Sequence, residues 1–173
     1  MIIHLFASGA ILLGCAYLGV LFGTSYRKRV QQLVEFENVL MQLEFDIDFM
    51  GVTLDESFEK IVRNCEGGVK DVLSYVCLWL RKDRFSNMAK LWERGFKKFR
   101  TDIFLTDEDI DILIEFSKSL GCGDRIREKN NIKMASMRLK LAEEEAREEA
   151  KKNIKMYRGL GLLTGVFLVI VLI

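Results

Sequence analysis

The chain has 173 residues, half of them hydrophobic, with 26 Lys and Arg against 25 Asp and Glu. This length fits one modest domain, and a net charge of +1 lacks the basic excess that nucleic-acid binders use to neutralise phosphates. Proline, which interrupts helices, is absent, and apolar residues recur at helical spacing. The composition therefore predicts an all-α protein that binds no nucleic acid.

The N-terminal segment is predicted to be a membrane anchor. Residues 1–25 contain no charged side chain, and about 20 apolar residues suffice to cross a bilayer core of ~30 Å. The basic residues 27–29 follow this stretch, whereas a signal peptide carries its basic residues before it. The apolar run also continues past residues 12–15, Leu-Leu-Gly-Cys, which resemble a lipoprotein cleavage box. We therefore predict an uncleaved transmembrane helix over residues 1–23.

The C-terminal segment is predicted to be a second, shorter anchor. Residues 159–173 carry no charge either, and a helix of this length extends about 22 Å at ~1.5 Å per residue. It spans the membrane if the bilayer thins locally or if Met156 and Tyr157 contribute. Basic residues precede it, and the positive-inside rule places both basic clusters in the cytoplasm. Residues 24–158 are therefore predicted to form a cytoplasmic helical bundle, with both termini outside.

Both terminal segments contain a pair of glycines four residues apart, Gly19 with Gly23 and Gly161 with Gly165. Such pairs let helices approach closely in lipid, so they favour packing of the two segments on each other. Glycine is also frequent in membrane helices in general. The sequence leaves both interpretations open.

The middle segment is predicted to hold about six helices. The first continues from the membrane and stops at Gly51, and residues 53–56, Thr-Leu-Asp-Glu, form a predicted capping box for the second. Gly67 and Gly68 break the chain before the third helix, and the polar residues 81–84 precede the fourth. The predicted inward residues of these helices are Leu33, Phe36, Leu40, Leu43, Ile47 and Met50; Leu54, Phe58, Ile61, Val62 and Cys65; Val69, Val72, Leu73, Val76, Cys77 and Leu80; and Met88, Leu91, Trp92, Phe96 and Phe99.

A second capping box, residues 106–109, opens the fifth helix, and the chain turns at residues 121–123 before the N-cap Asp124 of a long sixth helix that ends at Gly159. We expect the long first and last helices to pair antiparallel near the membrane while the four shorter ones build a distal bundle. The predicted inward residues are Ile110, Leu113, Ile114 and Leu120, then Ile132, Ala135, Leu139, Ala142 and Ala146.

The sequence contains no recognisable catalytic or cofactor site. Its single histidine is His4, inside the predicted anchor, and neither common nucleotide-binding glycine motif occurs. The four cysteines, Cys15, Cys65, Cys77 and Cys122, are scattered, so we expect buried, reduced thiols and neither a disulfide framework nor a zinc site. The chain is therefore predicted not to be an enzyme and to hold no metal or cofactor.

The densest carboxylate cluster is Asp107, Glu108, Asp109 and Asp111. Carboxylate oxygens are the ligands that Ca²⁺ prefers. Acidic residues at a helix N-terminus also stabilise the helix dipole, and that role alone accounts for most of them. We favour this second interpretation.

Four segments, taken in order with the two apolar ends, carry a resemblance to a known family. They are residues 40–47 (Leu-Met-Gln-Leu-Glu-Phe-Asp-Ile), 53–58 (Thr-Leu-Asp-Glu-Ser-Phe), 120–125 (Leu-Gly-Cys-Gly-Asp-Arg) and 155–161 (Lys-Met-Tyr-Arg-Gly-Leu-Gly). With them the sequence resembles the stage III sporulation protein AB (SpoIIIAB) family of endospore-forming bacteria, over essentially its whole length.

The resemblance implies a structural part of the sporulation channel between mother cell and forespore, similar to the inner-membrane platform proteins of type II secretion and type IV pilus machines. It implies the mother-cell membrane around the forespore as the location. The implied partners are the companion secretion-type ATPase and other channel subunits, with self-association left open. The implied orientation, with the bundle in the mother-cell cytoplasm, agrees with the one predicted from charge.

Two other functions stay open at this point. A membrane-tethered signalling adaptor or sensor needs sizeable segments outside the membrane, of which the sequence shows almost nothing. A membrane enzyme that uses carboxylates alone would rely on the acidic cluster. For a docking surface, the sequence suggests the segments 81–84 and 97–100 with their basic residues, although plain solvated polarity is the better explanation of them.

Overall fold

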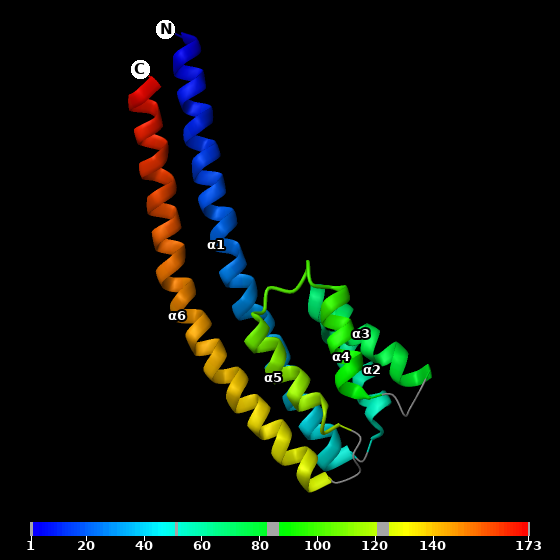
Figure 1. Cartoon of the computed structure of the whole chain (residues 1–173). Helices are drawn as coiled ribbons and strands as arrows, with labels where there is room; N and C mark the ends of the chain where they lie inside the picture. The colour runs from blue at the N-terminus through cyan, green and yellow to red at the C-terminus, as the bar shows by residue number, and fades with distance from the viewer. Residues whose placement is uncertain (1, 51, 83–86, 121–124, 173) are drawn as a thin grey trace. The chain divides into compact units, whose positions relative to one another are not determined.

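The computed structural model has helices as its only regular structure over the residues that it describes, which are 2–50, 52–82, 87–120 and 125–172 (Figure 1). The all-α prediction is confirmed. The predicted breaks at Gly51 and residues 121–123, and the predicted N-cap Asp124, lie outside the described residues. The elements are α1 (Ile2–Phe45), the π-helix η1 (Asp46–Met50), α2 (Leu54–Asn64), α3 (Gly67–Lys82), α4 (Met88–Lys98), α5 (Asp107–Ser117) and α6 (Arg125–Leu172).

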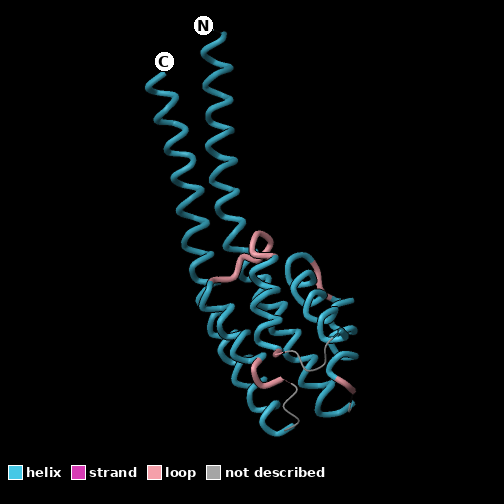
Figure 2. The backbone as a smooth tube through the Cα atoms, turned by 45° about the vertical axis from the view of Figure 1, so that its right-hand side comes forward, coloured by secondary structure: helices cyan, strands magenta, loops and turns pink. Residues whose placement is uncertain are grey.

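The chain forms two compact units, of which the first contains residues 1–30 of α1 and 145–173 of α6. In this unit the two helices lie side by side in both views, with their terminal ends together (Figures 1 and 2). The largely buried Arg29 side chain donates to Glu149 Oε2 at 2.8 Å. Ala146 and Ala150 are buried. The antiparallel pairing of the first and last helices is confirmed for this unit.

The terminal membrane segments stay a prediction. In the part of the chain that the structure describes, no helix combines the length and the apolar character needed to span a membrane. The apolar side chains of residues 1–23 and most of those of residues 159–173 lie outside the described part, as do His4 and the paired glycines. The backbone of residues 2–23 and 159–172 is helical and belongs to α1 and α6.

The second unit, residues 31–144, has an aromatic core centred on Trp92, which is fully buried. Its ring centroid lies 6.3 Å from those of Phe36 and Phe58, 5.9 Å from that of Phe96 and 6.2 Å from that of Phe116. These rings come from α1, α2, α4 and α5, so the first long helix belongs to the bundle core. The expectation that four short helices form the bundle beside a separate long pair was therefore too simple.

Most predicted inward residues are buried, including all of those of α3 and α6. The half-buried exceptions are Ile47, Leu54, Val62, Phe99 and Ile114. Met50 is wrong as a core residue because it is 57% exposed. The α-helical period ends at Asp46, where η1 begins, and the wider π turn rotates the last side chains away from the face that the earlier residues define.

The two predicted capping boxes have different outcomes. In the Thr106 box both hydrogen bonds are present, since Thr106 Oγ1 accepts from Asp109 N at 3.2 Å and Asp109 Oδ2 accepts from Thr106 N at 2.9 Å. The Thr53 box is wrong, because that side chain makes no capping hydrogen bond. The start of α2 is tied down instead by Ser57, whose hydroxyl donates to the buried Asp46 of η1.

Gly67 and Gly68 begin α3 rather than precede it, and the break between α2 and α3 falls at residues 65 and 66. Gly67 has a φ of +52°, which residues other than glycine rarely adopt. Gly68 packs directly on the α4–α5 loop: an added Cβ would lie 2.8 Å from the carbonyl carbon of Asp102 and 3.1 Å from its Cβ. One glycine is therefore required by backbone conformation and the other by close approach.

Candidate functional site

Helices α3 and α4 approach each other closely because Gly95 faces α3. A Cβ added at Gly95 would lie 3.3 Å from Val72 Cγ1 and 3.5 Å from Tyr75 Cδ1, which leaves no room for a larger residue without adjustment. This contact brings the C-terminal end of α4 beside the exposed side of α3. It thereby joins two segments that are about twenty residues apart in the sequence.

Aromatic and basic side chains alternate along this junction. Tyr75 has its ring centroid 6.1 Å from that of Trp79 and 6.4 Å from that of Phe99. The Lys82 ammonium lies 5.2 Å from the centroid of the Trp79 ring, and the Lys98 ammonium lies 5.1 Å from that of Tyr75 and 5.2 Å from that of Phe99. We call these five residues the aromatic–basic surface.

This surface is accessible and carries positive charge. Trp79 is 37% exposed, both lysines are exposed, and Tyr75 and Phe99 are half-buried. Neither lysine forms an ion pair with another described residue. Each cation–π contact contributes about 0.5–1 kcal/mol at an exposed site, which holds the ammonium groups over the rings while leaving them able to bind an anion. The arrangement suits a partner that presents carboxylates next to apolar side chains.

The loop that follows Phe99 is held rigidly against α1. Gln32 Nε2 donates to the Asp102 carbonyl at 2.8 Å, and Gln32 Oε1 accepts from the Phe104 backbone N–H at 2.7 Å. Arg100 donates to the carbonyls of residues 103 and 105 at 3.1 and 3.2 Å. These bonds fix the start of the loop, so Phe99 and Lys98 do not depend on a partner for their position.

A groove of about 480 Å³ between α2 and α3 borders the aromatic–basic surface and shares Lys82 with it. Its walls include Val62 and Cys77, and Leu78 on its rim is 54% exposed. A groove with an apolar floor beside an exposed tryptophan is typical of sites that accept an anchoring side chain of a partner protein.

The structure separates the basic residues predicted for docking into two groups. Arg81 pairs with Glu59 of α2, and Arg100 holds its own loop and Asp107, so both are structural. Lys82 and Lys98 instead belong to the aromatic–basic surface. Residues 83 and 84 lie outside the described part.

Sequence reasoning missed the aromatic residues of the surface. Tyr75, Trp79 and Lys82 are spaced i, i+4 and i+7 on α3, which places them on one helix face. That spacing was visible, but it competed with the stronger apolar pattern of the buried face. The contact with Lys98 and Phe99 could not be seen, because it depends on how α3 and α4 pack.

The four carboxylates of the acidic cluster lie in different surroundings. Asp109 is 2% exposed and belongs to the Thr106 capping box. Asp107 accepts from Arg100 at 3.2 Å, and Glu108 and Asp111 are exposed on α5. Over the described ranges, no group of three His, Cys, Asp or Glu residues is placed to hold a metal ion. The interpretation as helix N-terminal residues is confirmed for Asp109.

Cys65 and Cys77 are buried free thiols, as predicted, while Cys15 and Cys122 lie outside the residues whose side chains are described. Burial is the main cause that raises the pKa of Cys65 to about 11, and the nearby Glu35 carboxylate adds to the effect. Burial also raises the pKa of Cys77. Thiols with raised pKa values are poor nucleophiles at neutral pH, so these two groups suit a structural role.

Fold and surface together define a helical-bundle protein with an exposed aromatic–basic surface. The sequence model of the stage III sporulation protein AB (spore_III_AB) family matches residues 4–173, and the chain belongs to this family. The stage III sporulation protein AB of Bacillus subtilis (strain 168) is 28% identical over 163 residues, which are 94% of each chain. The solved structure of a stage III sporulation protein AB (SpoIIIAB) shares the fold, with a TM-score of 0.65 and 24% identity over 71% of this chain and 96% of that one.

Proposed function

We propose that the chain is a membrane-anchored platform of the sporulation channel, which docks a secretion-type ATPase through the aromatic–basic surface and performs no chemistry itself. Membership of the sporulation family gives the process. The observation that carries the docking role is the stacking of Lys82 on the exposed ring of Trp79 and of Lys98 on the half-buried rings of Tyr75 and Phe99. Tryptophan and tyrosine beside fixed positive charges are typical of interface hot spots.

Membrane anchoring at both ends is the second part of the proposal. It is supported by the uncharged residues 1–25 and 159–173 and by the basic residues that flank each of them on the inner side. The bundle then faces the mother-cell cytoplasm, where an ATPase has access to nucleotide. The membrane is the mother-cell membrane around the forespore, and other channel subunits are the further partners.

The test is a pull-down of the full-length protein from membranes of sporulating cells, with the ATPase and channel subunits quantified by mass spectrometry. Trp79→Ala should reduce ATPase recovery about tenfold or more, because truncating a hot-spot residue costs at least ~2 kcal/mol. The double variant Lys82→Glu/Lys98→Glu should reduce it further, because it places like charges against an acidic partner. Lys60→Glu/Lys90→Glu, which changes two other exposed lysines, is the matched control.

The outcomes separate the parts of the proposal. Full ATPase recovery with Lys82→Glu/Lys98→Glu would contradict the docking surface but not the platform role. Absence of both ATPase and channel subunits from the wild-type sample would contradict the platform role itself. Extraction of the protein from membranes by carbonate at high pH would contradict the anchors.

A further inference from the structure

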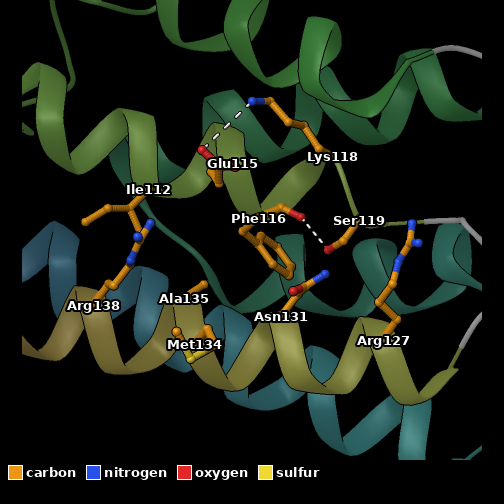
Figure 3. A pocket seen from close by; sticks show the side chains of 10 residues that line it. All are labelled: Ile112, Glu115, Phe116, Lys118, Ser119, Arg127, Asn131, Met134, Ala135 and Arg138. Atoms are coloured by element: carbon orange, nitrogen blue, oxygen red, sulfur yellow. Dashed lines mark hydrogen bonds and ion pairs between the residues drawn. The ribbon is translucent and has the colours of Figure 1, made fainter.

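A second groove, of about 500 Å³, lies between α5 and α6 and shares no residue with the aromatic–basic surface (Figure 3). Ile112 and Phe116 of α5 face Met134 and Ala135 of α6 across it, and Arg138 stands at its edge. All of these residues belong to the second unit. The groove has a mixed lining, in which these four apolar residues lie among polar and charged ones, and α6 contributes the positively charged Arg127 and Arg138.

Helix α6 continues from the groove into an exposed apolar stripe. Its four members are all more than half exposed: Ile126 77%, Met134 58%, Met137 61% and Leu141 63%. At 3.6 residues per turn they fall within an arc of about 80°, on the side of the helix opposite the buried seam of Ile132, Ala135 and Leu139. The exposed Asn130 lies in the same arc between Ile126 and Met134, so the continuous apolar part is Met134, Met137 and Leu141. The helix thus has an apolar face that the bundle does not cover, and contiguous exposed apolar surface of this kind is typical of interaction sites.

Positive charge flanks this stripe. Residues 129–141 contain no Asp or Glu. Lys133 and Lys140 lie on the edge of the stripe away from the groove, and Arg138 lies on the edge next to it. None of these three forms an ion pair with another described residue. The stripe therefore suits a helix that brings acidic side chains to both of its edges.

The neighbouring helix α5 presents the opposite charge. Its exposed row consists of Asp107, Glu108, Asp111 and Glu115, and residues 107–117 contain no Lys or Arg. Glu108 and Asp111 form no ion pair within the described part of the chain. Ile112, half-buried, joins this row to the groove. The acidic row, the groove and the basic-edged stripe thus form one continuous surface.

We propose that this α5–α6 surface binds a second copy of the chain through an isologous interface, with the acidic row of each copy on the apolar stripe of the other. The acidic complement of the basic edges of the stripe is present on the same molecule, directly across the groove, which is the condition for a self-complementary two-fold contact. Figure 3 shows Ile112 beside Arg138 and Ser119 toward Arg127, so α5 and α6 run antiparallel. Rotation about a two-fold axis parallel to both helices leaves the position of each residue along the axis unchanged. It therefore places Glu108 and Asp111 of one copy against Arg138 and Lys140 of the other.

The test uses full-length protein in detergent, with two differently tagged copies co-expressed and one tag pulled down. Wild-type copies should recover each other. The variant Arg138→Glu/Lys140→Glu should lose self-recovery at least about tenfold, because both contacts of its homodimer become acid against acid. Glu108→Lys/Asp111→Lys should lose it equally. Co-expression of these two variants should restore recovery, because both contacts of the mixed pair are again of opposite charge.

The matched control is Lys82→Glu/Lys98→Glu, which reverses two exposed charges on the aromatic–basic surface and should leave self-recovery unchanged. All substituted residues are exposed, and circular dichroism checks that each variant keeps its helices. The proposal is overturned if wild-type copies do not recover each other, if either charge-reversal variant self-associates like wild type, or if the mixed pair fails to associate. A wild-type monomer that still binds the ATPase would contradict this interface alone and leave the proposed function intact.

Discussion

Replacing Gly67 and Gly68 in turn by alanine should separate two kinds of glycine requirement at adjacent positions. At Gly67 an added Cβ meets nothing within 4 Å, and the φ of +52° is the only obstacle. Holding a non-glycine residue in the left-handed region costs roughly 1–2 kcal/mol, and the less flexible unfolded chain returns about 0.4–1 kcal/mol. We therefore expect Gly67→Ala to lower the free energy of unfolding by about 1 kcal/mol.

At Gly68 the obstacle is the backbone of the α4–α5 loop. A Cβ placed 2.8 Å from the Asp102 carbonyl carbon cannot be accommodated by turning a side chain, and overpacking of this kind costs about 1–3 kcal/mol. Moving Asp102 also breaks the hydrogen bond that its carbonyl accepts from the buried Gln32 side chain, which adds about 1–3 kcal/mol. We expect Gly68→Ala to cost about 2–6 kcal/mol.

The assay is thermal unfolding of the full-length protein in mild detergent, followed by circular dichroism. For a chain of this size, 1 kcal/mol corresponds to about 2–4 °C in Tm, so Gly67→Ala should lower Tm by a few degrees and Gly68→Ala by about 5 °C or more. Gly159→Ala, at an exposed helical glycine with open space around it, is the control and should not lower Tm. If Gly67→Ala destabilises the protein as much as Gly68→Ala, the close approach to Asp102 is not the reason that glycine is required at position 68.

Three further predictions concern helix starts, the core and the buried thiol. Thr106→Ala should cost about 1 kcal/mol in denaturant unfolding, whereas Thr53→Ala should cost close to nothing because its side chain makes no capping hydrogen bond; equal losses would contradict the assignment. Trp92→Ala should cost about 3–5 kcal/mol. Trp92→Phe should cost far less, because it also removes an indole N–H that finds no acceptor among the described residues. Alkylation of Cys65 by iodoacetamide should stay slow until the pH approaches its pKa of about 11, and Glu35→Gln should shift that rise to lower pH. Because the folded-state pKa exceeds the ordinary value of 9.0, the protonated thiol stabilises the fold below pH 9 and this contribution is lost as the pH rises toward 11.

Local patterns predicted the helices well where one face dominates. On α3 and α6 every inward residue identified from spacing is buried, since a regular α-helix maps sequence period directly onto one face. The pattern failed at Met50 because the switch to a π-helix at Asp46 has no signal in apolar spacing. It failed at Thr53 because a capping-box motif specifies residue types but not the side-chain rotamer that the capping hydrogen bond requires.

The candidate docking surface shows the same limit at longer range. The sequence identified the basic segments 81–84 and 97–100, but it could not distinguish Arg81 and Arg100, which bind other parts of the fold, from Lys82 and Lys98, which lie over aromatic rings. That distinction depends on the close contact at Gly95. Such contacts join residues distant in sequence, and no local period encodes them.

By itself, then, the sequence determined the helical class, the uncharged ends, the position of most helices and the family, because these depend on composition, local spacing and the order of short motifs. Only the tertiary structure decided that α1 enters the aromatic core, that Tyr75 and Trp79 meet Lys98 and Phe99, and that the acidic row of α5 lies across a groove from the apolar stripe of α6. The physical reason is that surfaces are made by the packing of helices against each other, which selects one face of each helix for burial and leaves the other exposed.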